Sequence, residues 1–301
     1  MPPERPSCSS LSRAFQEEQA GTASRYRFWL MVEQQGPWGH QALLESRFPA
    51  EAGRRLRSLE GRLGLRTLLI KRRDRPAPER RQCFAAFTGR KDRRLVTFEV
   101  GDPADLLDLD LPALVRRRFR GLGEEVAGPL FLVCTHGKHD ACCARHGAPL
   151  YRALAGEGDG AVWEATHVGG DRFAGNLVCF PHGMYFGRVV PAEAPALTRA
   201  YARGEVVLDR YRGRSAFSPP IQAAEHFLRR DTGLLGVDAL VLTGHRADGN
   251  AHSVEFRADE ARYLVEVEVG ASHGRPLTCK AVHPHRPQAF TLRSIERRAG
   301  P

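Results

Sequence analysis

Two apolar segments in the middle of the chain, separated by a cysteine-bearing loop and a helix, constrain the fold most strongly. Residues 129–134 predict a buried strand that ends at Cys134, and residues 141–155 predict a helix. A second apolar strand, residues 161–166, ends next to His167. If the two strands are parallel neighbours, Cys134 and His167 meet at one edge of a sheet, where α/β folds place their sites.

The helix begins with two further cysteines, Cys142 and Cys143, so thiols lie at both ends of the loop. Thiolates and imidazoles select zinc, copper or iron–sulfur clusters over magnesium or calcium. Each cysteine taken alone could instead be an inert, buried apolar side chain. The loop adds four polar side chains that favour the metal interpretation of the group: His136, Lys138, His139 and Asp140.

Three segments of this region, CTHGKHDACC, THVGGDRFAGN and FPHGMYFGRV, resemble the sucrase/ferredoxin-like family, whose central part is similar to thioredoxin-like [2Fe-2S] ferredoxins. The resemblance extends upstream to residues 19–43 and downstream to YRGRS and IQAAEHFLR. In fungal relatives two cysteines spaced C-x8-C and two histidines spaced H-x3-H hold the cluster. The resemblance therefore implies a [2Fe-2S] cluster in this chain, with aspartate in place of the last histidine, at Cys134, Cys143, His167 and Asp171.

Asp171 also fits a second role. GGD before RFAGN is typical of a helix N-cap, in which the aspartate side chain accepts a hydrogen bond from a backbone N–H. A carboxylate is moreover a hard ligand that suits iron–sulfur chemistry poorly. If Asp171 only caps a helix, the fourth ligand comes from Cys142, Cys179, His182 or a group outside the chain.

The predicted elements follow the same order in both halves of the chain. The first half has strands at 26–32, 67–70, 83–87 and 95–100 and helices at 54–63 and 106–119. The second half has strands at 129–134, 161–166, 176–180 and 184–190 and helices at 141–155 and 193–203. Strand–helix–strand followed by a hairpin and a helix is the thioredoxin-like topology, so we predict an α/β fold with two tandem thioredoxin-like halves. The first half is degenerate, because GPWG stands where the second half has HGKHDACC.

Four regions follow from this reading: an N-terminal arm 1–24, a degenerate thioredoxin-like half 25–125, a ferredoxin-related half 126–232 and a small antiparallel β region 233–301. In the arm we expect a short helix at 10–19 and interpret Cys8 as a bystander. Alternating apolar and polar residues predict the strands of the last region: 238–243, 253–257, 263–269 and 277–282. The HPHRP segment that follows is interpreted as a loop with solvated histidines.

The net charge of +10 comes almost wholly from arginine, which with abundant alanine and glycine indicates a GC-rich genome rather than nucleic-acid binding. A basic surface suits docking of an acidic redox partner protein. No apolar run reaches the roughly 18 residues of a membrane span, and the N-terminus lacks a signal-peptide core, so we expect a cytoplasmic protein without a membrane partner. Seven irregularly spaced cysteines do not predict a disulfide framework.

The leading functional hypothesis is a [2Fe-2S] electron-transfer protein. A thiol redox protein that uses Cys134, Cys142 or Cys143 is one alternative, although vicinal cysteines form only a strained disulfide and no C-x-x-C motif is present. A metal-free thioredoxin-like binding module is the other. Hydrolysis of sucrose would need a pair of carboxylates across the sugar, and no acidic pair near the cysteines indicates one, so a redox role is favoured over a hydrolase.

Overall fold

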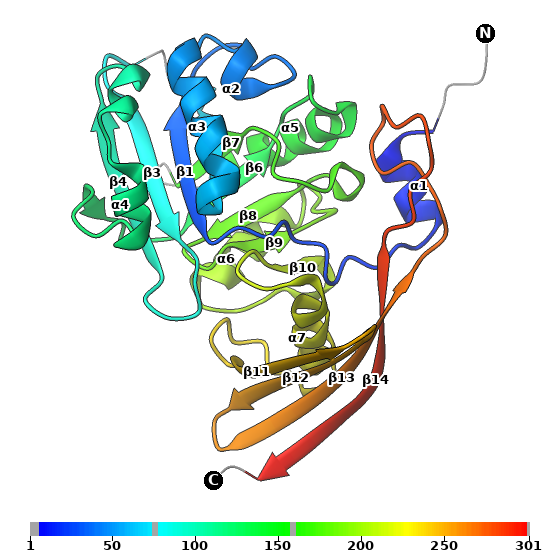
Figure 1. Cartoon of the computed structure of the whole chain (residues 1–301). Coiled ribbons are helices and arrows are strands. Elements are labelled where there is room, and N and C mark those ends of the chain that lie inside the picture. The colour runs from blue at the N-terminus through cyan, green and yellow to red at the C-terminus, as the bar shows by residue number, and fades with distance from the viewer. Residues whose placement is uncertain (1–5, 74–77, 157–160, 300–301) are drawn as a thin grey trace, which may run out of the picture.

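The computed structural model of the chain describes residues 6–73, 78–156 and 161–299 (Figure 1). Within these ranges the strands form one ten-stranded mixed sheet and one four-stranded antiparallel sheet towards the C-terminus. The predicted α/β class and the small antiparallel C-terminal sheet are therefore confirmed.

The first half of the large sheet has a strand–helix–strand unit followed by a hairpin. Its elements in chain order are β1 (Phe28–Glu33), α2 (Ala42–Glu45), α3 (Ala50–Leu63), β2 (Leu65–Lys71), β3 (Arg81–Phe87), β4 (Arg94–Val100), the 3-10 helix η1 (Pro103–Leu107), α4 (Leu111–Arg116) and β5 (Glu124–Glu125). The strand order is β2-β1-β3-β4-β5. β1 is parallel to β2 and antiparallel to β3.

The second half repeats this arrangement. Its elements in chain order are β6 (Leu130–Cys134), α5 (Ala141–Ala155), β7 (Val162–Ala165), the 3-10 helix η2 (Asp171–Phe173), β8 (Leu177–Phe180), β9 (Met184–Phe186), α6 (Ala194–Ala202), the 3-10 helix η3 (Leu208–Arg210) and β10 (Tyr211–Arg214). The strand order is β7-β6-β8-β9-β10, and β6 is parallel to β7 and antiparallel to β8. β6 and β7 therefore end at the same edge of the sheet.

The two halves join where β2 pairs antiparallel with β7, through Ile70 opposite Ala165 and Lys71 opposite Glu164. Because β2 and β7 hold equivalent places in their halves, this pairing relates the halves by a local two-fold rotation. The chain thus builds one continuous sheet from two similar units (Figure 1).

Buried apolar side chains cover both faces of this sheet. Alternation along β1 turns Leu30 and Val32 towards the core under α3 and α4, and Trp29 and Met31 towards the opposite face. The core on that opposite face continues across both halves, whereas α5 and α6 cover a separate core of the second half. Among the described residues, no helix has both the length and the apolar character needed to cross a membrane.

The single helix predicted at 106–119 is wrong, because the structure has η1 and α4 there, separated by a break. Pro112 lies in the first turn of α4, and the Asp110 side chain accepts the backbone N–H of Ala113 at 3.0 Å. Proline cannot donate the hydrogen bond that a continuous helix needs at this position, and a capping aspartate starts a new helix instead.

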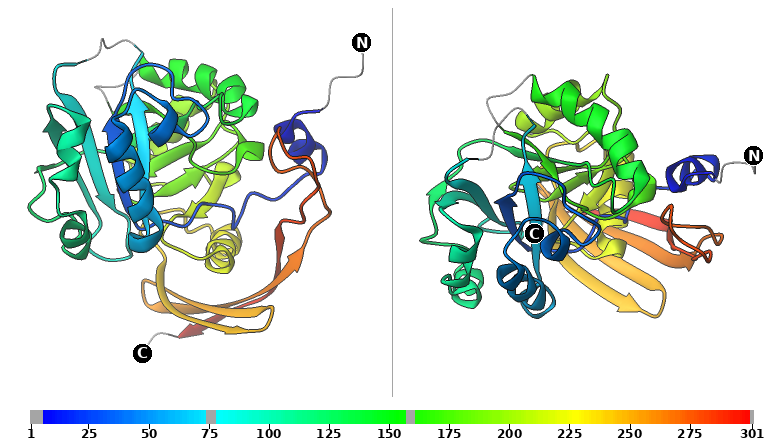
Figure 2. Two further views of the ribbon diagram at one scale, coloured as in Figure 1. Left: turned by 45° about the horizontal axis from the view of Figure 1, so that its top comes forward. Right: turned by 90° about the horizontal axis from the view of Figure 1, so that it is seen from above.

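The C-terminal part is a helix packed on the small sheet (Figure 2). Its elements are α7 (Pro219–Thr232), β11 (Val241–Asp248), β12 (Ala251–Ala258), β13 (Ala261–Ala271) and β14 (Gln288–Ala299). The strands pair antiparallel in sequence order. α7 lies between the small sheet and the large one (Figure 1).

The strand predicted at 277–282 is wrong. These residues belong to the loop between β13 and β14, and the fourth strand of the sheet is β14, after the HPHRP segment. The loop reaches back to the N-terminal helix α1 (Cys8–Ala14), beside the large sheet (Figures 1 and 2). The backbone N–H of Cys279 donates to Asp140 at 2.6 Å, so this segment is held by contacts distant in sequence rather than by a strand partner.

Candidate metal centre

The ends of β6 and β7 place the predicted ligands together. The parallel pairing expected for these strands is confirmed, with Cys134, the last residue of β6, opposite Ala165 of β7. His167 follows β7, and Cys143 lies in the first turn of α5. The sulfur atoms of Cys134 and Cys143 and a ring nitrogen of His167 all lie within 4.8 Å of one another.

Asp171 completes this group, which we call the strand-end site: Cys134, Cys143, His167 and Asp171. Its Oδ1 atom lies 2.9 Å from His167 Nδ1 and accepts a hydrogen bond from the Cys143 thiol at 3.1 Å. The helix N-cap interpretation of Asp171 is wrong, because the N-cap of η2 is Gly170, which has a φ of 77°. The carboxylate faces the thiol and the imidazole instead.

The two thiols of the strand-end site have opposite pKa shifts. The hydrogen bond from Cys143 and the neighbouring His167 hold the pKa of Cys134 well below its usual range despite burial. The same hydrogen bond, burial and the nearby negative charges raise the pKa of Cys143. These shifts favour a thiolate at Cys134 and a thiol at Cys143, whose single proton is shared between the Cys134 sulfur and Asp171 Oδ1. Thiolate is the form of cysteine that binds metals.

His167 and Asp171 form a charged pair beside the thiols. Burial alone lowers the pKa of His167, but hydrogen bonds to Asp171 and Cys134 outweigh it and raise the pKa to about 9. Burial opposes ionisation of Asp171, yet its hydrogen bond with His167 lowers the pKa of the carboxyl. In the metal-free protein these shifts favour an imidazolium at His167 next to a thiolate and a carboxylate.

Histidines from both halves of the chain surround the exposed side of His167. The His139 ring stacks on the His167 ring with centroids 3.9 Å apart, and His40 stacks on His139 at 5.3 Å. His136 donates from Nε2 to the Gly39 carbonyl oxygen at 2.8 Å and accepts the backbone N–H of His167 at Nδ1. The GPWG turn of the first half therefore packs directly against the site, a role that its sequence did not reveal.

A pocket of about 460 Å³ opens over these rings. Arg57 and Arg66 line it together with the four histidines His40, His136, His139 and His167. Arg66 also donates to the His167 carbonyl oxygen at 2.8 Å. The strand-end site is thus buried on its cysteine side and faces a basic pocket on its histidine side.

The donor atoms of the strand-end site suit an iron–sulfur centre in three of four positions. Two thiols and an imidazole are ligands that such centres use, and the lowered pKa of Cys134 favours its thiolate form. The fourth position holds a carboxylate, a harder donor. Because His167 Nδ1 and Cys143 carry protons bound to Asp171, metal binding through these atoms must release protons.

The other ligands considered from the sequence are engaged elsewhere. Cys179 lies in β8, packed into the core under α5 and α6, and burial raises the pKa of its thiol. His182 lies 2.6 Å from the Tyr201 hydroxyl through Nδ1 and 3.7 Å from Asp238 through Nε2. Cys142 turns away from Cys143 and contacts the thiols of two residues far away in sequence.

Those contacts define a second group, the three-segment cluster: Cys8, Asp140, Cys142 and Cys279. Its four ligand atoms lie within 4.8 Å of one another, so this group too could hold a metal ion. Cys8, which the sequence predicts to be a bystander, is 1% exposed and lies against Cys142. Spacing in the sequence gave no indication of the cluster, because its cysteines lie on three separate segments.

Comparison with known proteins identifies a family and several relatives that are similar to this chain. A family model described as sucrase/ferredoxin-like matches residues 19–213. Altered inheritance of mitochondria protein 32 of Eremothecium gossypii is 32% identical over 126 residues, which cover 34% of this chain and 40% of that protein. The protein of the same name from Meyerozyma guilliermondii is 32% identical over 101 residues, covering 30% of this chain and 36% of the relative. The chain thus matches less than half the length of these relatives, and no solved structure matches significantly.

Proposed function

The chain belongs to the sucrase/ferredoxin-like family, and from this premise we propose that it is a [2Fe-2S] electron-transfer protein with its cluster at the strand-end site. The observation that carries the proposal is the meeting of Cys134, Cys143 and His167 within 4.8 Å at the ends of two parallel strands. Cys134 and Cys143 form one donor pair, and His167 with Asp171 forms the other. When bound, the cluster supplies one-electron transfer at a potential set by its ligands.

In the same proposal, both halves of the large sheet are thioredoxin-like. The chain then has four regions: the arm 1–24, the first half 25–125, the second half 126–232 and the β region 233–301. The shared strand order and the strand–helix–strand units support this reading. The first half has no cysteine at its equivalent turn, and the GPWG turn instead supports His136. Its role is to cover and position the site of the second half.

The surrounding residues perform two tasks for such a centre. Burial of Cys134 and Cys143 keeps water and oxidants away from the sulfur ligands, since their exposed fractions are 1% and 0%. His136 holds the backbone of His167 through its Nδ1 atom, and His139 covers the face of the His167 ring. Asp171 binds the proton at His167 Nδ1 until that nitrogen is needed as a ligand.

The redox partner in this proposal is an acidic protein that docks over the histidine-lined pocket. Arg57 and Arg66 on the rim and the net charge of +10 support this choice of partner. Complementary charge accelerates the encounter of two proteins and orients them. Electron transfer from a centre behind His167 needs only proximity, so the partner need not contact the sulfur atoms.

A thiol redox function is the second candidate. The hydrogen bond between the Cys134 thiolate and the Cys143 thiol resembles the reactive pair of a dithiol enzyme, which supports it. Thiol exchange requires direct attack on a sulfur atom of the substrate. Because both cysteines are buried, exchange with a protein substrate is blocked unless the site opens, and electron transfer is the better fit.

Anaerobic purification of the full chain tests the proposal through iron content, labile sulfide and the visible spectrum. We expect about two irons and two sulfides per chain, lost in Cys134→Ser and in Cys143→Ser. Cys142→Ser and Cys83→Ser are matched controls, since Cys142 faces the other cluster and Cys83 is buried in β3, and both should keep iron. A colourless, iron-free wild type would overturn the proposal. A mass lower by two hydrogens would then show a disulfide and indicate the thiol function, whereas an unchanged mass would indicate the metal-free module.

A further inference from the structure

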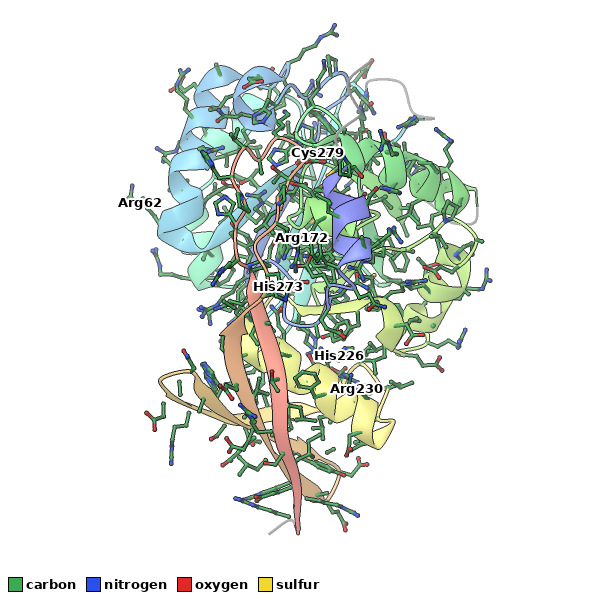
Figure 3. All side chains as sticks on the ribbon, turned by 90° about the vertical axis from the view of Figure 1, so that its right-hand side faces the viewer. Arg62, Arg172, His226, Arg230, His273 and Cys279 are labelled. Atoms are coloured by element: carbon green, nitrogen blue, oxygen red, sulfur yellow. The ribbon has the colours of Figure 1, made fainter. Side chains whose placement is uncertain are left out.

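The three-segment cluster combines parts of the chain that are far apart in sequence. Cys8 begins α1, Cys142 lies in the first turn of α5, and Cys279 lies in the loop between β13 and β14. The sulfur of Cys8 is 3.6 Å from that of Cys142 and 3.6 Å from that of Cys279, and the last two sulfurs are 3.4 Å apart. Figure 3 shows Cys279 beside α1 and the start of α5.

Asp140 closes this triangle of sulfurs. Its carboxylate oxygens lie 3.8 and 3.9 Å from Cys8 Sγ and accept the backbone N–H groups of Cys142 at 2.9 Å and Cys279 at 2.6 Å. Asp140 is fully buried, and no basic side chain in the described part of the chain forms an ion pair with it. Hydrogen bonds and positive charge together offset the cost of a buried carboxylate, and a cation among the three sulfurs would supply the charge that the backbone N–H groups do not.

We propose that the three-segment cluster is a structural zinc site, in which the thiolates of Cys8, Cys142 and Cys279 and the carboxylate of Asp140 hold one Zn²⁺. This inference does not rest on the proposed electron-transfer function. Each of these cysteines that is still protonated releases its proton to solvent when the ion binds, and no oxidant or reductant is required.

The spacing of the sulfur atoms selects a single ion. Tetrahedral Zn–S bonds of about 2.3 Å place two sulfurs about 3.8 Å apart, close to the 3.4–3.6 Å between these thiols. A polynuclear cluster would separate its thiolates by intervening iron and sulfide atoms. Soft thiolates prefer zinc over magnesium or calcium, and four protein ligands with no open position are typical of a structural site.

Outer contacts already hold the ligands in place. Ser9 Oγ lies 3.2 Å from Cys142 Sγ and 3.1 Å from His146 Nε2, so the start of α1 is fixed on α5. Lys280, next to Cys279, donates to the carbonyl oxygen of Lys138 at 2.8 Å. Hydrogen bonds from residues around a metal site orient the ligands and raise the affinity for the metal. A bound ion would therefore join the N-terminal helix and the β13–β14 loop to α5.

Zinc binding by the full chain carrying Cys134→Ser, Cys143→Ser and His167→Ala tests the site, because these changes remove both cysteines of the strand-end site and the histidine that Asp171 and His139 contact. Stripped of metal under reducing conditions and given Zn²⁺ alone, this chain should bind about one equivalent. Adding Cys8→Ser, Cys142→Ser or Cys279→Ser should abolish binding, and adding Cys83→Ser should not. Asp140→Asn still caps α5 but should weaken zinc binding by about tenfold or more.

The proposal is overturned if the parent chain binds no zinc, or if zinc is retained after each of the three serine changes. A parent chain lighter by two hydrogens would assign the thiols to a disulfide instead. Should the serine variants fail to fold by circular dichroism, hydrogen exchange of the parent chain decides. Zn²⁺ should slow exchange in α1 and in residues 272–287, and an unchanged exchange rate there rejects the site. Since iron plays no part in these measurements, failure of the electron-transfer proposal leaves their outcome unaffected.

Discussion

Among single residues, Asp171 determines the charge state of the strand-end site. Its Oδ1 atom contacts both His167 and Cys143, so it stabilises the imidazolium and accepts a hydrogen bond from the thiol. A histidine at this position, as the H-x3-H spacing of the fungal pattern implies, would instead supply a second imidazole donor. The aspartate therefore favours a protonated metal-free site and must lose both hydrogen bonds when a metal binds.

Asp171→Asn should lower the pKa of His167 in the metal-free protein from about 9 towards its usual 6.5. The amide removes the negative charge that stabilises the imidazolium. The His167 ring signals in an NMR titration measure this shift directly. His182 is the internal control, because its partner Asp238 is unchanged and its own titration should not move. An unaltered His167 titration would show that Cys134 rather than Asp171 holds the imidazolium.

Asp171→His should increase retention of iron when the anaerobically purified protein is challenged with a chelator. Imidazole is a better match for iron–sulfur chemistry than carboxylate, and the change removes the hydrogen-bond acceptor that competes for His167 and Cys143. Iron loss over time is the measurement, with Asp140→Asn as the control in the other cluster. Equal or faster loss from the histidine variant would show that the carboxylate holds iron at this position at least as well as an imidazole does.

Among the elements, α5 connects the two cysteine groups. Cys142 and Cys143 are consecutive in its first turn, and successive residues of a helix point about 100° apart. One thiol therefore joins the three-segment cluster and the other the strand-end site. The position of α5 at the end of β6 therefore sets the geometry of both cysteine groups.

Gly147→Ala tests this dependence on the position of α5. A Cβ atom at Gly147 would lie 1.9 Å from the Cys134 carbonyl oxygen, so the helix must move away from β6. We expect a loss of at least about 2 kcal/mol in the free energy of unfolding together with reduced iron content. Gly61→Ala in α3 is the matched control, since nothing lies within 4 Å of its added methyl group, and it should stabilise the protein by roughly 0.5–1 kcal/mol. Denaturant unfolding compares the two, and similar stability changes would contradict the packing argument.

Local patterns in the sequence predicted the elements around the strand-end site but not the partners of distant segments. Apolar runs and the helical period located β6, α5 and β7 to within about one residue. The alternation in 277–282 is equally typical of a strand, yet its residues lie in a loop held by Asp140 and α1. The meeting of Cys8 with Cys279 likewise depends on tertiary structure, which periodicity does not encode.

At the scale of the whole molecule, α7 connects the large sheet to the small one. Glu225 of α7 accepts hydrogen bonds from Arg214 of β10 at 2.8 Å and from Arg229, one helical turn away, at 2.9 Å. The Tyr211 hydroxyl donates to the same carboxylate at 2.7 Å. Glu225 and Arg229 are fully buried, and the opposite face of α7 packs on the small sheet. This network is therefore the polar part of the contact between the two sheets.

Low pH should weaken this contact between the two sheets. Burial alone raises the pKa of Glu225, but the charges of Arg214 and Arg229 outweigh it and lower the pKa to about 2 from a usual 4.5. Stability from this group is present above pH 4.5 and is lost as the pH falls through about 2, for a total of about 3 kcal/mol.

Glu225→Gln should abolish that pH dependence and destabilise the protein by about 3–5 kcal/mol at pH 7, because two buried arginines lose their counter-charge. Denaturant unfolding between pH 3 and 7 measures both effects. Glu296→Gln, which removes an exposed partner of Arg298, is the control and should change stability by less than about 1 kcal/mol. If the wild type and Glu225→Gln lost stability equally between pH 4.5 and 3, the acid sensitivity would have to come from other carboxylates.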